Sequence, residues 1–171
     1  MKTIAHRMRG KINAALLLLL ASCATDTANA SLACTASATS VVFGTYDPLA
    51  VAPLDSAGSV SISCDLTFPS AASKVNYSFS LSAGVSGSML ARYMESPPNQ
   101  LNYDLYTSNA YSQIWGDGSA GTANVSGSMK LGSPGSVWSK TDTYTVFGRI
   151  VALQDALPGN YFDTIIVTVT Y

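Results

Sequence analysis

Apolar and polar side chains alternate along several short stretches of this chain, and clusters of Gly, Ser, Pro and Asp separate these stretches. In residues 59–64, SVSISC, three apolar side chains fall on one face and three serines on the other. Residues 75–81, VNYSFSL, repeat the alternation with Val75, Tyr77, Phe79 and Leu81 on the apolar face. A period of two is typical of half-buried β-strands, so both stretches are predicted strands.

The rest of the chain follows the same rhythm, with a strand-like stretch about every ten to fifteen residues and no sustained helical period. The other predicted strands are 39–46, 101–107, 112–118, 122–132, 142–153 and 164–171. Turn sequences separate them: DPL at 47–49, GDG at 116–118 and LPGN at 157–160. The pattern therefore predicts an all-β fold of the sandwich type.

The last stretch, TIIVTVTY, is rich in β-branched residues and is a strong strand signal. Its apolar row, Ile165, Val167, Val169 and Tyr171, lies on one face. No later strand follows to pair with its edge, and an open edge of this kind invites strand addition by another chain. We expect these four residues to form a strand-acceptor edge, unless the N-terminal strand of the same molecule covers it.

Composition agrees with one globular β domain, since 47% of the 171 residues are apolar and only 11% are charged. The first thirty residues differ from the rest, because basic residues precede the short apolar block AALLLLLA at 14–21. This order is typical of a secretory signal peptide. We expect residues 1–30 to be the signal and 31–171 the domain, with cleavage after Ala30. Cleavage after Ala24, and lipidation at Cys23 within LASC, are the alternatives.

Removing residues 1–30 leaves five Lys and Arg against nine Asp and Glu, a net charge of −4, so nucleic acid is not an expected partner. It also removes His6, the only histidine. No His-based triad or His metal site can then form, and we expect neither catalysis nor a cofactor, metal or small-molecule substrate. Asp104 and Asp117 are candidates for a carboxylate pair, but we expect solvated loop carboxylates instead.

Two cysteines remain after either ordinary cleavage, Cys34 and Cys64. In an exported chain such a pair predicts a disulfide, because two thiolates without histidine do not complete a zinc shell. Closing a loop of about thirty residues is expected to stabilise the fold by roughly 3 to 4 kcal/mol. The bridge would tie the first strand to a later one.

Several stretches together resemble the spore coat protein U domain family, which includes subunits of archaic, Csu-type chaperone–usher pili. They are CTASATSVVFGTYDPL at 34–49, GSVSISC, YSFSLSAG, LNYDLYT, IWGDG, YTVFGRI and the ending LPGNYFDTIIVTVTY. The resemblance covers essentially all of the chain after the signal. It implies an immunoglobulin-like β-sandwich that lacks its final, seventh strand. It also implies passage through the periplasm with a chaperone, assembly through an outer-membrane usher, and neighbouring pilus or coat subunits as partners at the cell surface.

One feature departs from the family pattern. Such a subunit donates an N-terminal extension to its neighbour, whereas cleavage at Ala30 leaves three residues before Cys34. Cleavage at Ala24 leaves TDTANASLA, a weak donor with Ala28, Ala30 and Leu32 in alternation. The leading hypothesis is a structural subunit of a secreted fibre or coat, assembled by donor-strand complementation. The alternative is a non-polymerising adhesin or binding module with a self-complete sandwich.

Overall fold

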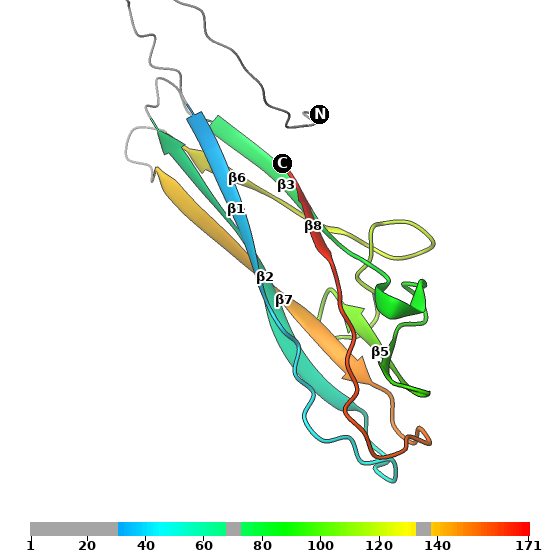
Figure 1. Ribbon diagram of the computed structural model, residues 1–171. Coiled ribbons are helices and arrows are strands. Elements are labelled where there is room, and N and C mark those ends of the chain that lie inside the picture. The colour runs from blue at the N-terminus through cyan, green and yellow to red at the C-terminus, as the bar shows by residue number, and fades with distance from the viewer. Residues whose placement is uncertain (1–30, 68–72, 133–137) are drawn as a thin grey trace, which may run out of the picture.

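The computed structural model describes residues 31–67, 73–132 and 138–171, in which eight strands form two antiparallel sheets (Figure 1). The strands are β1 (Ser31–Thr39), β2 (Leu54–Thr67), β3 (Ser73–Leu81), β4 (Tyr93–Ser96), β5 (Asn99–Tyr106), β6 (Val125–Leu131), β7 (Ser139–Ile150) and β8 (Val167–Thr170). One sheet has the order β1-β2-β7-β5-β4 and the other β6-β3-β8. A single 3-10 turn, η1 (Gly84–Ser86), follows β3. The prediction of an immunoglobulin-like β-sandwich is confirmed.

The core lies between the two sheets and is built from the alternating rows that the sequence predicts. On β2, Val60 and Ile62 are 2% and 0% exposed. On β3, all four residues of the predicted apolar row are buried: Val75, Tyr77, Phe79 and Leu81. Burial of such side chains is the main source of fold stability, at about 1.5 to 3 kcal/mol each.

The first strand was misplaced by the sequence pattern. It was expected at 39–46, but β1 ends at Thr39 and pairs with β2 over Ser31–Thr39. Beyond that point the chain crosses Gly58 so closely that a Cβ there would lie 2.6 Å from the Thr39 carbonyl oxygen. Gly44 then has a φ of 79°, a conformation that side chains disfavour. Residues 40–46 therefore leave the ladder, with Val41 and Phe43 packed against the core and Val42 73% exposed.

The terminal strand is shorter than the pattern predicts. Only Val167–Thr170 forms β8, which pairs with β3 from Leu81↔Val167 to Ser78↔Thr170. Because β3 ends at Leu81 and the chain then enters η1, residues 163–165 find no ladder partner in β3. The short edge strand β4 is an element that the sequence pattern missed.

The predicted disulfide is present, with Cys34 of β1 bonded to Cys64 of β2, directly opposite it in the ladder. It holds an edge strand to the five-stranded sheet. The predictions for cleavage at Ala24 or Ala30 and for lipidation at Cys23 lie outside the described residues. Among the residues that are described, no helix has the length and apolarity needed to cross a membrane.

Candidate strand-acceptor groove

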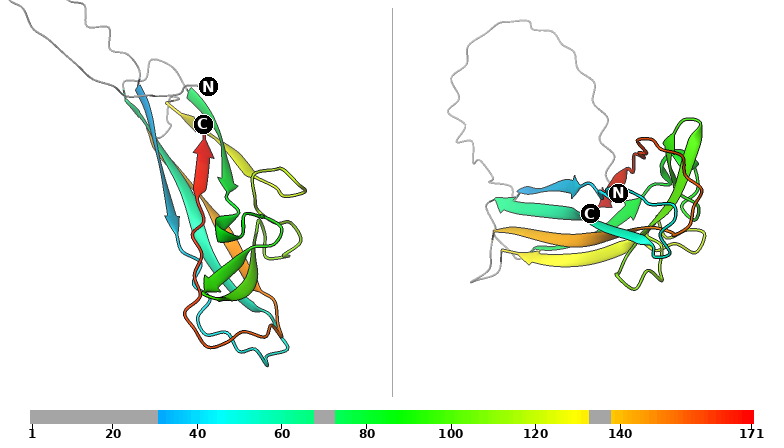
Figure 2. Two further views of the ribbon diagram at one scale, coloured as in Figure 1. Left: turned by 45° about the vertical axis from the view of Figure 1, so that its right-hand side comes forward. Right: turned by 90° about the horizontal axis from the view of Figure 1, so that it is seen from below.

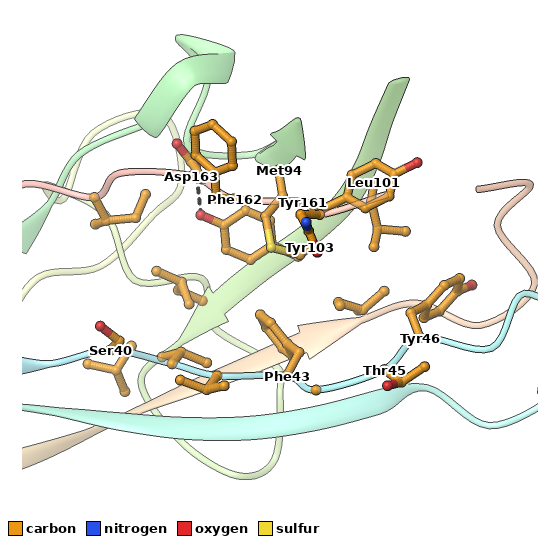
Figure 3. Close-up of a pocket in the computed structure, with 18 of the residues that line it drawn as sticks. Ser40, Phe43, Thr45, Tyr46, Met94, Leu101, Tyr103, Tyr161, Phe162 and Asp163 are labelled. Carbon is orange, nitrogen blue, oxygen red and sulfur yellow. Dashed lines mark hydrogen bonds between the residues drawn. The ribbon is translucent and has the colours of Figure 1, made fainter. Parts of the chain in front are cut away.

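A cavity of about 960 Å³ opens between two long segments of the chain (Figure 3). One wall comes from residues 38–46, and the other from residues 156–163 with Ile165 and Val167. Its floor is apolar and includes Val60, Leu81, Leu101, Leu105, Val146 and Ile150. We call this cavity the acceptor groove. Figures 1 and 2 show that residues 40–53, in cyan, and 151–162, in orange to red, run along the same end of the sandwich.

The first wall is held in place by close packing on the five-stranded sheet. Val41 and Phe43 turn inward over Gly148 of β7, where a Cβ would lie 2.7 Å from either side chain. The Phe43 ring meets Tyr103 of β5 edge-on, with 5.9 Å between centroids. A glycine at 148 is needed because any side chain there would occupy the space that these two residues fill.

The second wall presents an unpaired backbone edge to the groove. The amide of Ser82 donates to the carbonyl of Ile166 at 3.0 Å, and Phe162 exchanges two backbone hydrogen bonds with Glu95. Residues 162 and 166 thus direct their backbone groups toward the body of the protein. Along an extended chain the backbone N–H and C=O groups of successive residues point to opposite sides. Those of Ile165 and Val167 therefore point away from β3 and β4. No described strand pairs with that side of β8.

The four residues of the predicted acceptor edge have different positions. Ile165 and Val167 line the groove and pack against the core. Val169 also packs against the core but lies beyond the groove lining. Tyr171 does not line the groove: it is 61% exposed, and its hydroxyl lies 3.5 Å from the carbonyl oxygen of Cys34.

The N-terminal strand does not cover this edge within the part of the chain that is described. β1 pairs with β2 and belongs to the other sheet. The walls therefore face each other without a strand between them. Tyr46 of the first wall is bonded to the segment that precedes the second wall, because its hydroxyl donates to the Val151 carbonyl at 3.1 Å and accepts from the Gln154 amide at 2.7 Å.

A carboxylate that the sequence pattern did not single out lies on the second wall. Asp163 faces inward in the row that continues to Ile165 and Val167, and its Oδ2 accepts a hydrogen bond from the Tyr103 hydroxyl at 2.7 Å (Figure 3). Burial, reinforced by this hydrogen bond, raises the pKa of Tyr103, so the phenol stays protonated and is the donor. The sequence does carry one signal for Asp163, because an acidic side chain at an inward position interrupts an otherwise apolar strand row.

The two carboxylates weighed from the sequence have separate environments. Asp117 is exposed in a turn, where Ser119 donates to it from both its amide and its hydroxyl. Asp104 is not a solvated loop residue: it lies on β5, and burial raises its pKa to about 6. Across the described residues, His, Cys, Asp and Glu do not gather in groups that could hold a metal ion.

The family model for the Spore Coat Protein U domain matches residues 14–168. The chain belongs to the Spore Coat Protein U domain family. Among curated proteins, none matches it.

This Spore Coat Protein U domain chain is also similar to a solved structure. That structure is the CsuC–CsuE chaperone-tip adhesion subunit pre-assembly complex from the archaic chaperone–usher Csu pili of Acinetobacter baumannii. The identity is 23% and the TM-score 0.50, over 82% of this chain. The match spans 40% of the other chain, and at this identity it supports the fold alone.

Proposed function

We propose that this protein is a structural subunit of a secreted bacterial surface fibre, a pilus or a coat. Its sandwich is completed when another chain adds a strand to the acceptor groove. The observation that carries the proposal is the apolar groove beside an unpaired strand edge. A strand added there would gain main-chain hydrogen bonds from the edge and bury its alternate side chains on the floor. Ile165 and Val167 would form the acceptor edge, and Val169 and Tyr171 its continuation.

The partners of this proposal are a periplasmic chaperone, an outer-membrane usher and neighbouring subunits. Membership of the Spore Coat Protein U domain family and the likeness to a chaperone-bound pilus subunit support this route, with passage through the periplasm to the cell surface. The chain has a structural role in this scheme and no catalytic step. A self-complete adhesin would need a strand between the two walls, and β1 does not supply it.

Co-production with the periplasmic chaperone of a chaperone–usher system tests the proposal. We expect the exported chain to co-purify with the chaperone and to be marginally stable when produced alone, because its groove is then empty. The control for a charge placed in the groove, as in Val167→Asp, is Thr168→Asp on the exposed face of β8. Val60→Asp would not serve as a control, because it places a charge in the core. A wild-type monomer that folds cooperatively without a chaperone and adds no strand would refute the fibre-subunit function and support the self-complete adhesin.

A further inference from the structure

The second wall is fixed to the protein at two points, with a gap between them. At one end Phe162 exchanges backbone hydrogen bonds with Glu95 of β4, at 3.0 and 3.2 Å. At the other end Ile166 accepts from the Ser82 amide and donates its own amide to the Ser82 hydroxyl at 2.9 Å. The residues between these points carry the backbone groups that face the groove. Something must hold them in an extended line if an incoming strand is to pair with them.

Asp163 supplies the contacts that span this gap. Its Oδ1 accepts the Val85 amide at 2.9 Å, from η1, and the Thr164 amide at 2.7 Å, from the wall itself. Its Oδ2 accepts the Tyr103 hydroxyl from the groove floor. One carboxylate therefore ties the wall to η1 and to β5. Gly84 is part of this arrangement, since a Cβ there would collide with the carboxylate of Asp163.

A buried cation holds the anchor point of Ile166 in place. Arg92 is 0% exposed and donates to the carbonyl oxygens of Ser82, at 2.8 and 3.1 Å, and Trp115, at 2.8 Å. Burial lowers the pKa of Arg92, and neighbouring groups that include Tyr103 and Asp163 oppose that shift. Arg92 thus fixes Ser82, the anchor of Ile166, next to the region that Asp163 holds.

We propose that Asp163 is the positioning residue of the acceptor groove, which holds the backbone of residues 163–167 straight for pairing with a donor strand. It acts through the wall and does not itself need to touch the donor. The inference rests on the proposed strand-acceptor function. It explains why a charged side chain occupies an inward position in an otherwise apolar row, where a carboxylate would be costly without its three donors.

Binding of a synthetic donor tests this role in the full exported chain. The probe is a fluorescein-labelled peptide, KTVTVTVTK, in which Val and Thr alternate, and its affinity is measured by fluorescence anisotropy. Asp163→Ala removes all three contacts. Because these three hydrogen bonds hold the acceptor edge in its extended line, we expect the peptide affinity to fall about tenfold or more. Asp163→Asn keeps an oxygen that can accept from the two amides, so this variant should retain most of the wild-type peptide affinity.

A matched control exists at a distance from the groove. Tyr77 donates its hydroxyl to Asp142, a second phenol–carboxylate pair that does not line the groove. Asp142→Ala should lower the free energy of unfolding but leave peptide affinity unchanged. If Asp163→Ala fails to fold, Tyr103→Phe carries the same test, because it removes one of the three contacts and should weaken binding severalfold.

The outcomes separate this inference from the function on which it rests. Wild-type protein that binds the peptide, with Asp163→Ala or the substitute Tyr103→Phe binding equally well, would overturn the role of Asp163 and leave the acceptor function intact. An equal loss of affinity in Asp142→Ala would also overturn it, since the effect would then be general destabilisation. Wild-type protein that binds no peptide would overturn both.

Discussion

A charge placed on the inward face of β8 gives the sharpest test of the acceptor edge. Val167 packs against the core, pairs with Leu81 and lines the groove. Val167→Asp loses the burial of a half-buried valine, about 1 kcal/mol. It also places an unpartnered carboxylate among apolar groups. If burial raises that carboxylate's pKa by about two units, the charged form costs about 3 kcal/mol more. We expect a total loss of about 4 kcal/mol at pH 7.

The control is the next residue along, because Thr168 is exposed on the other face of the same strand. Thr168→Asp should change the free energy of unfolding by about 0.5 kcal/mol or less. Urea denaturation, followed by the fluorescence of the buried Trp115, measures both variants. The introduced carboxyl at position 167 has its folded pKa raised above its unfolded one, so the deficit in the free energy of unfolding should shrink as the pH falls from about 6 to about 4. Equal losses in both variants, or a deficit that does not change with pH, would refute the reasoning.

Three further predictions concern the frame of the groove. Replacing both Cys34 and Cys64 by Ala should lower the free energy of unfolding by about 3 to 4 kcal/mol, because the disulfide closes a loop with a sequence separation of 30. A denaturant titration that shows a loss below about 1 kcal/mol would contradict this. The pKa of Asp104 is raised to about 6 by burial, so its contribution to stability is lost as the pH rises from about 4 to 6. Asp104→Asn should therefore be more stable than wild type at pH 7 but not at pH 3.5, and an equal difference at both pH values would argue against a buried carboxylate. Gly148→Ala should displace Phe43 and weaken binding of the KTVTVTVTK peptide, and unchanged affinity would show that the first wall tolerates the added methyl group.

Much of the fold was predictable from the sequence because its signals are local. The alternation in residues 59–64 and 75–81 determines which side chains face inward, whatever the partner strand is. The cysteine pair, in a chain whose sequence predicts an export signal, predicts a disulfide without knowledge of the register. The β-branched ending predicts a strand with an apolar row, and Ile165, Val167 and Val169 do pack on the core.

The groove itself was decided by the tertiary structure. Residues 39–46 have the pattern of a strand, yet the approach of Gly58 and Gly148, both distant in the sequence, draws them out of the ladder. Likewise β8 is short because β3 ends at Leu81, a fact about its partner and not about its own residues. The role of Asp163 depends on Tyr103 and Val85, which lie 60 and 78 residues away. Alternation and turn chemistry act between neighbours in the chain, whereas strand pairing and the burial of a charge depend on groups that only folding brings together.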